Sequence, residues 1–132
     1  MRSIKLREEV QGQGAPIREG DVGYIQYSVF RINGDLMFAL GKGAELQRDE
    51  GEQYRMVLGG GQVPKAVELG MAGMREGGRR RIVVPPALGW DTSGGLPAPT
   101  TFSGKRKLEL YRAQPLMMEV DLQRVVPKRK LE

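Results

Sequence analysis

Cysteine and histidine are both absent from the 132 residues of the chain. Their absence excludes disulfide bonds, thiol nucleophiles, zinc sites built from these residues and every catalytic triad that needs an imidazole. We therefore expect neither a metal ion nor a cofactor. Any chemistry has to come from shape, hydrogen bonds or carboxylates.

Long apolar runs are also absent. No stretch approaches the roughly twenty apolar residues that cross a bilayer, and residues 1–12 lack the continuous apolar core of a secretory signal. Hydrophobic residues make up 39% of the chain and charged residues 28%, a composition typical of one folded soluble domain. We expect no membrane span and a monomer.

The formal net charge of +5 comes mainly from short basic clusters. They are Arg79–Arg81, Lys105–Lys107 and Lys128–Lys130. No aromatic residue alternates with these charges, as a base-stacking surface requires. A solvated basic surface is thus favoured, with Arg79–Arg81 at a strand edge, and nucleic-acid binding stays the weaker alternative.

Alternating hydrophobicity predicts several strands. Residues 23–32 alternate with period two and end at a turn signal, Asn33-Gly34. Residues 54–58 and 116–125 follow the same pattern, with Glu119 and Asp121 facing outward. The inward side chains of the last strand are Leu116, Met118, Val120 and Leu122.

Other parts of the chain give weaker signals. Residues 1–16 are predicted as an N-terminal edge segment, 35–53 as a loop, and 98–114 as an extra segment that forms a short hairpin. Residues 126–132 are predicted as a basic, disordered tail. A short helix is predicted to begin at Pro64 and to end at the glycines that follow.

The stretch from residue 69 to residue 91 carries the most specific pattern. Glycines mark a helix end and a loop, and Arg79–Val84 then reads as a strand. Pro85-Pro86 end this strand because proline has no N–H to donate. Trp90 follows on a loop beside Gly89, where we expect it to line a cleft.

This order of elements resembles the FKBP family of peptidyl-prolyl cis-trans isomerases. The residues that carry the resemblance are Gly70, Met74, Gly77, Arg79, Arg81, Ile82, Val84, Pro86, Leu88 and Trp90. The resemblance covers about residues 17–125, with 98–114 as an insertion. It implies an α+β fold in which an antiparallel β-sheet of four to six strands wraps around one short helix. The expected core is Ile25, Tyr54, Met56, Leu58, Met74, Ile82, Val84 and Val120.

The resemblance also implies a site, with Tyr27 and Trp90 in the catalytic positions. Tyr27 matches a wall tyrosine, and Trp90 replaces a tyrosine whose hydroxyl holds a substrate carbonyl. When the chain is aligned with the family pattern from Tyr27 onward without a gap, Met37 falls where the family has a phenylalanine and Phe38 where it has an aspartate. A shift by one aligns Phe38 with the phenylalanine and Ala39 with the aspartate. In either register the carboxylate is missing.

The remaining substrate-binding positions are apolar or altered. Tyr54 is a second aromatic wall, and Gln62 and Val63 lead into the helix. Pro64 stands where a backbone N–H of the family donates to the bound prolyl carbonyl, and it has no N–H to give. The other positions are Val67 for a tryptophan, Leu96 for an isoleucine and Met118 for a phenylalanine. On alternation alone Tyr27, Met37, Tyr54 and Met118 would be ordinary core residues.

The implied function is weak isomerisation of X-Pro bonds that assists protein folding, because polar anchors of the pocket are missing. The alternative is a non-catalytic binding or chaperone module that uses residues 98–114 or the cup, our name for the apolar pocket that the resemblance implies for the proline ring. Expected partners are proline-containing polypeptides or a protein client. The altered pocket and the basic insertion resemble those of family members from plastids, especially from the thylakoid lumen. The cytoplasm and the nucleus remain alternative locations, the nucleus because of the basic segment Pro127–Lys130.

Overall fold

The structure, a computed structural model, describes residues 4–41, 49, 51–90 and 96–130. Its sheet contains six strands, all paired antiparallel, in the order β1-β5-β6-β2-β3 with β4 also pairing with β2. The strands are β1 (Leu6–Val10), β2 (Val22–Arg31), β3 (Leu36–Leu40), β4 (Tyr54–Val57), β5 (Arg79–Val84) and β6 (Leu116–Val126). The helices are α1 (Lys65–Met71) and α2 (Phe102–Tyr111), and Pro86–Leu88 and Lys128–Lys130 form single 3-10 turns.

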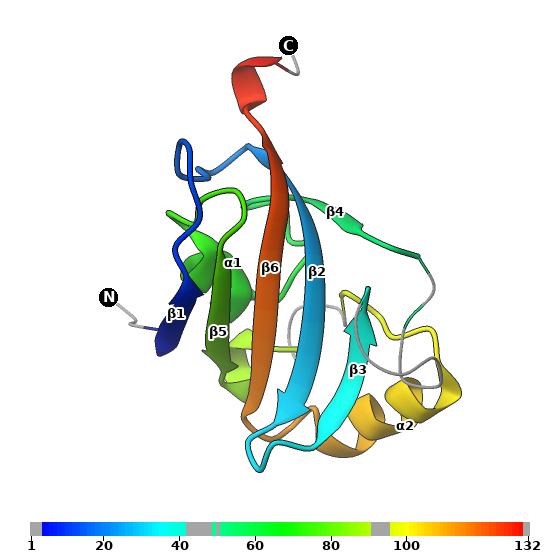
Figure 1. The fold of residues 1–132 in the computed structure, drawn as a ribbon. Helices are drawn as coiled ribbons and strands as arrows, with labels where there is room; N and C mark the ends of the chain where they lie inside the picture. The colour runs from blue at the N-terminus through cyan, green and yellow to red at the C-terminus, as the bar shows by residue number, and fades with distance from the viewer. Residues whose placement is uncertain (1–3, 42–48, 50, 91–95, 131–132) are drawn as a thin grey trace.

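The sheet curves around α1, which lies against β5, and α2 lies beside β3 (Figure 1). The predicted α+β class, with an antiparallel sheet wrapped around one short helix, is confirmed. The two long strands β2 and β6 pair along almost their whole length and form the centre of the sheet.

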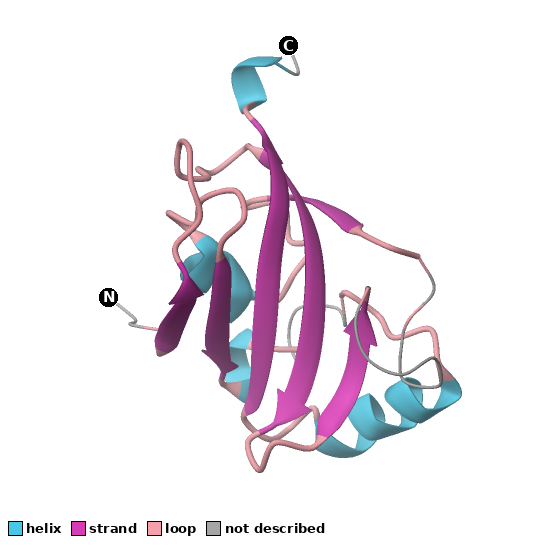
Figure 2. Cartoon of the chain, in the orientation of Figure 1, coloured by secondary structure: helices cyan, strands magenta, loops and turns pink. Residues whose placement is uncertain are grey.

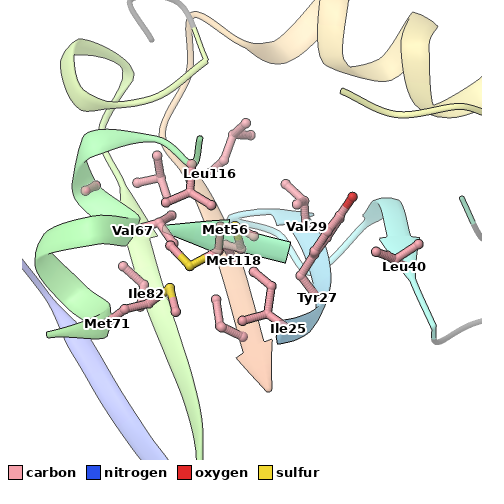
Figure 3. Close-up of a cluster of buried hydrophobic side chains, with 14 of the residues drawn as sticks. Ile25, Tyr27, Val29, Leu40, Met56, Val67, Met71, Ile82, Leu116 and Met118 are labelled. Carbon is pink, nitrogen blue, oxygen red and sulfur yellow. The ribbon is translucent and has the colours of Figure 1, made fainter. Parts of the chain in front are cut away.

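One face of the sheet makes the core with α1. Val67 and Met71 of α1 lie over Ile82 and Met118 of the neighbouring strands (Figure 3). The expected core residues are buried except Tyr54, which is half-buried. Apolar side chains recur every second residue along β2 and β6, and this period places them on a single face.

The sequence pattern predicts that the helix ends at Gly70, but this glycine lies inside α1. A Cβ at this position would stand 2.8–2.9 Å from three side-chain carbons of Ile82. The absence of a side chain therefore lets α1 approach β5 closely. The helix continues to Met71, and Gly73, with φ +86°, follows it.

Residues 35–53 are not all loop, because Leu36–Leu40 form β3. The short apolar run pairs with β2 and is buried from Met37 to Leu40. Pairing along β2 supplies the backbone hydrogen bonds that the local pattern could not reveal. Positions 42–48 and 50 of the predicted loop lie outside the described residues.

The hairpin predicted within residues 98–114 is wrong: Phe102–Tyr111 form the helix α2 (Figure 2). Thr101 caps its N-terminus by accepting a hydrogen bond from the Gly104 backbone N–H at 3.0 Å. The run from Lys105 to Leu110 consists of good helix formers, and Leu108 is buried. Capping and helix propensity thus decide the conformation of this segment.

The arginines of β5 do not form a solvated strand edge. β5 pairs with β1 on one side and β6 on the other. Arg79 Nε lies 2.7 Å from Asp121 Oδ1, and Arg81 Nε lies 2.9 Å from Glu119 Oε2. Arg80, on the opposite face, donates to the backbone oxygens of Gly70 at 2.9 Å and Ala72 at 3.0 Å. Neighbouring strands therefore supply partners for these arginines.

The basic tail is ordered in its described part, contrary to the prediction. Val126 still belongs to β6 and pairs with Val22. Lys128–Lys130 form a 3-10 turn, and the Lys128 backbone N–H donates to Asp21 Oδ1 at 2.9 Å. Residues 131–132 lie outside the described residues.

Candidate functional site

Aromatic side chains from separate parts of the chain meet at the β2–β3 side of the sheet. The ring centroids of Tyr27 and Phe38 are 6.2 Å apart, those of Tyr27 and Tyr54 6.2 Å, and those of Phe38 and Trp90 6.0 Å. All three pairs are edge-to-face, with planes 81–88° apart, the arrangement that aromatic quadrupoles favour. We call this group the aromatic cluster.

The strand register explains why Phe38 belongs to this cluster. Tyr27 pairs with Leu40 and Val29 with Phe38, but Phe30 pairs with Leu36. Met37 is therefore the extra residue of a β-bulge, which restores the alternation for Phe38. Phe38 thereby lies beside Tyr27, and Met37 is buried as well.

A carboxylate does reach Tyr27, although the sequence pattern indicated that none would. The Tyr27 hydroxyl donates to Asp49 Oδ2 at 3.3 Å, and the Thr100 backbone N–H donates to Asp49 Oδ1 at 2.9 Å. Asp49 is only 3% exposed. It follows a polar, Gly-bearing segment without periodicity, so no sequence signal distinguished it. We call Tyr27, Asp49 and Thr100 the Asp49 clasp.

Burial sets the protonation behaviour of the Asp49 clasp. Loss of water raises the pKa of the Asp49 carboxyl, and the hydrogen bonds from Thr100 and Tyr27 partly oppose this rise. Burial, reinforced by the charge of Asp49, raises the pKa of Tyr27 far above its ordinary value. The phenol therefore keeps its proton and acts as the donor to Asp49. In Figure 3 the Tyr27 hydroxyl points away from the core residues under α1.

Trp90 is buried, contrary to the expectation that it lines a cleft. Its side chain is 1% exposed, and its indole N–H donates to the Pro97 backbone oxygen at 3.2 Å. Pro97 and Pro99 are buried as well, while Leu96 remains 40% exposed. The indole N–H of Trp90 is thus bound to a carbonyl of the chain itself.

The predicted residues near α1 also form contacts within the chain. The Tyr54 hydroxyl donates to the Gln62 backbone oxygen at 2.6 Å, and Gln62 Oε1 accepts from the Val57 backbone N–H at 2.7 Å. Val63 and Val67 are buried, and Pro64 caps α1. Met118 is fully buried on β6, where it pairs with Val29 of β2 and Ile82 of β5.

The arrangement is an apolar, aromatic site with one phenol–carboxyl pair. Across the described ranges, no group of three or more acidic side chains is placed to hold a metal ion. No helix within those ranges is long and apolar enough to cross a membrane. Tyr27, Phe38 and Trp90 are each at most 2% exposed, whereas Tyr54 is half-buried. Tyr54 is therefore the member of the aromatic cluster that reaches the surface.

Comparison with known proteins gives a consistent result. The family described as FKBP-type peptidyl-prolyl cis-trans isomerase matches residues 15–123. Two relatives from Arabidopsis thaliana are similar to this chain. "Peptidyl-prolyl cis-trans isomerase FKBP16-1, chloroplastic" is 26% identical over 123 residues, which cover 93% of this chain and 58% of that protein. "Peptidyl-prolyl cis-trans isomerase FKBP19, chloroplastic" is 34% identical over 129 residues, which cover 88% of this chain and 50% of that protein.

A solved structure shares the fold. The crystal structure of FkpA from Escherichia coli superposes with a TM-score of 0.62 at 19% identity, covering 97% of this chain and 54% of that one. The chain therefore spans about half the length of each of these three proteins.

Proposed function

This chain belongs to the FKBP-type peptidyl-prolyl cis-trans isomerase family, and on that premise we propose that it binds proline-containing polypeptides and isomerises their X-Pro bonds with weak activity, assisting protein folding. The observation that carries the proposal is the aromatic cluster, in which Tyr27, Phe38 and Trp90 meet from three elements. Aromatic rings of this kind suit contact with the apolar pyrrolidine ring of proline.

The reaction needs no nucleophile and no proton transfer. Its barrier, about 18–20 kcal/mol for a peptide bond, arises from amide resonance. Twisting the bond takes the nitrogen lone pair out of conjugation and reduces charge separation in the amide. A site that excludes water therefore favours the twisted amide over the planar one. The absence of histidine and cysteine is no obstacle to this chemistry.

We assign roles to the predicted residues on this basis. Tyr27 is a wall of the cup whose phenol is oriented by Asp49, and Phe38 and Tyr54 extend the aromatic surface. Trp90 packs edge-to-face against Phe38 and supports its ring. The remaining predicted contacts are Met37, Gln62, Val63, Pro64, Val67, Leu96 and Met118, of which Leu96 is the exposed one at the rim.

Two features support weak rather than strong activity. Pro64 has no N–H to donate, and the Trp90 N–H already donates to Pro97. Leaving a substrate carbonyl without a donor costs about 1–3 kcal/mol, which corresponds to about a five- to 150-fold loss in rate if the bond forms only in the transition state.

The test is cis-trans exchange of a blocked tetrapeptide with one Leu-Pro bond, followed by NMR exchange spectroscopy. We expect exchange above the uncatalysed rate, reduced in Tyr27→Phe, because this change removes the donor to Asp49. Tyr111→Phe is the matched control, since Tyr111 stacks on Arg31 at 3.9 Å and not in the aromatic cluster. Exchange at the uncatalysed rate, from protein shown to be folded by circular dichroism, would exclude the isomerase.

The second candidate is a non-catalytic binding or chaperone module for a protein client. The same two observations favour it, namely the proline at position 64 and the engaged indole N–H of Trp90. In that case the tetrapeptide binds without faster exchange. Titration followed by Trp90 fluorescence reports binding near the indole, and the exchange measurement reports catalysis. Binding without faster exchange identifies the module, whereas binding with faster exchange identifies the isomerase.

For the compartment we propose the plastid, and within it the thylakoid lumen. The support is that both Arabidopsis relatives carry the word chloroplastic in their names. The alternatives are the cytoplasm and the nucleus. Fractionation of the source cells, with protease protection of the lumen and detection by antibody, tests the proposal. Signal that follows cytosolic or nuclear markers would contradict it.

A further inference from the structure

α2 is held firmly on the β3 side of the sheet. A Cβ at Gly104 would stand 2.9 Å from the Cβ atoms of Phe38 and Pro99, so the helix backbone lies directly against a wall of the aromatic cluster. Lys107 Nζ donates to the Leu36 backbone oxygen at 2.9 Å. Leu108 is buried beneath the helix. These contacts make α2 a fixed platform beside the cup.

The opposite side of α2 is apolar and basic but faces solvent. Phe102 is 80% exposed and Leu110 59% exposed. The spacing i, i+4, i+8 places Phe102, Arg106 and Leu110 on one side of the helix. Lys105 and Arg106 are exposed, and neither makes an ion pair or hydrogen bond to side chains in the described part of the protein. Glu109, four residues after Lys105, is also exposed on this side. We call Phe102, Lys105, Arg106, Glu109 and Leu110 the outer face of α2, whose two cations outnumber its one carboxylate.

We propose that the outer face of α2 is a docking surface for acidic, apolar segments of the polypeptide whose proline enters the cup. The inference rests on the proposed function. Two exposed apolar side chains supply anchors, and two unpaired cations select carboxylates by charge complementarity. The occupant is thus an extended client segment in which glutamate or aspartate alternates with leucine-like residues.

The dimensions of α2 fit a polypeptide that spans both sites. Its 10 residues extend about 15 Å, which equals about five residues of extended chain. Phe102 stands two residues before Gly104, which contacts Phe38. A segment of about five residues therefore reaches along the whole helix, which lies beside β3 (Figure 1).

A lipid surface fits α2 less well than a polypeptide does. Interfacial helices that bind membranes carry a broad apolar face flanked by basic residues. Here the outer face has only two apolar side chains, and the exposed Glu109 lies next to Leu110 in the sequence. Vesicle binding is accordingly an outcome of the test and not the proposal.

The test is fluorescence anisotropy with labelled twelve-residue peptides, each with one Leu-Pro bond and an alternating Glu-Leu segment placed before or after it. We expect at least one of the two peptides to bind. Phe102→Ser/Leu110→Ser and Lys105→Glu/Arg106→Glu should each weaken that binding by about fivefold or more. A peptide with lysine in place of glutamate should bind the wild-type protein as weakly as the acidic peptide binds these variants. Added salt should weaken binding of the acidic peptide to the wild-type protein.

Two control variants match these changes. Leu69→Ser removes a leucine of α1 that is 41% exposed, and Arg129→Glu/Lys130→Glu changes the net charge by the same amount at the other end of the molecule. Both should bind the acidic peptide as the wild type does. The proposal is overturned if the α2 variants bind like wild type, if the controls lose as much, or if neither acidic peptide binds.

Parallel measurements separate this proposal from the proposed function and from membrane binding. Turnover of the blocked tetrapeptide by the wild-type protein reports on the cup alone. If peptide binding depends on α2 but the tetrapeptide is not turned over, the docking surface is supported and the isomerase is excluded. If the tetrapeptide is turned over but peptide binding does not depend on α2, the docking surface is excluded. Binding of the protein to phosphatidylcholine vesicles, with and without phosphatidylglycerol, is measured in parallel. Binding of anionic vesicles through α2 without binding of the peptides would overturn the proposal in favour of a membrane.

Discussion

Removing the carboxyl of Asp49 is the sharpest test of how the site is held together. Asp49→Ala leaves the Tyr27 hydroxyl and the Thr100 backbone N–H without their acceptor. An unsatisfied buried donor costs about 1–3 kcal/mol. Because Tyr27 is buried whereas Thr100 is exposed, the change should lower the free energy of unfolding by about 1–3 kcal/mol, mainly through Tyr27. Asp49→Asn keeps an acceptor for Thr100 and a partner for the phenol, and should cost much less.

The two variants also differ from wild type in pH dependence. Burial raises the pKa of Asp49 in the folded chain above its unfolded value. Between these two pKa values the folded chain binds more protons than the unfolded chain. The free energy of unfolding contributed by Asp49 is therefore greatest below the unfolded pKa and falls as the pH rises through the interval. Asp49→Asn lacks the titrating group, so this fall should be absent.

Urea denaturation between about pH 3 and pH 7 measures both effects, with isomerase activity recorded on the same samples. Asp35→Ala is a suitable control, because Asp35 makes an ion pair at 3.7 Å with Lys107 and its side chain is 45% exposed. It should change stability by less than about 1 kcal/mol. The reasoning is refuted if Asp49→Ala is as stable as wild type, or if Asp49→Asn is as unstable as Asp49→Ala.

Three further substitutions test other contacts. Gly70→Ala places a methyl group 2.8–2.9 Å from Ile82 carbons and should lower stability by about 1–3 kcal/mol; an unchanged melting temperature would argue against a tight α1–β5 contact. Arg80→Ala removes donors to two carbonyls at the end of α1 and should cost about 1–2 kcal/mol in urea denaturation, whereas Arg7→Ala, whose side chain is 78% exposed, should cost almost nothing. Trp90→Phe keeps a ring but loses the buried N–H bond and should cost about 1–3 kcal/mol. Emission of wild-type Trp90 should shift to longer wavelength on unfolding, and water-like emission from the native protein would contradict its burial.

Local patterns were sufficient wherever the physical signal is local. Alternation along β2 and β6 predicts which side chains are buried, because the strand geometry itself has period two. The turn at Asn33-Gly34 and the strand end at Pro85-Pro86 follow from backbone restrictions of the residues concerned. The signal for α2 was also present, since Thr101 is a good N-cap and a run of helix formers follows it.

Contacts between distant segments could not be predicted in the same way. Asp49 reaches Tyr27 across 22 positions and Thr100 across 51 positions. The bulge at Met37, which brings Phe38 to the aromatic cluster, depends on the register between β2 and β3. None of these relations leaves a periodic trace in the sequence, because each depends on how separate strands align.

By itself, the sequence determined the strands β2, β4, β5 and β6, the short helix α1, most of the apolar core and the family to which the chain belongs. Those properties follow from the period of hydrophobic residues and from glycine and proline, whose effects act on adjacent residues. Only the tertiary structure decided that Trp90 is buried with its N–H on Pro97, that Asp49 holds Tyr27, and that α2 turns Phe102 and Leu110 to solvent. The reason is physical: burial and partner choice depend on which segments the sheet brings together when it closes around α1.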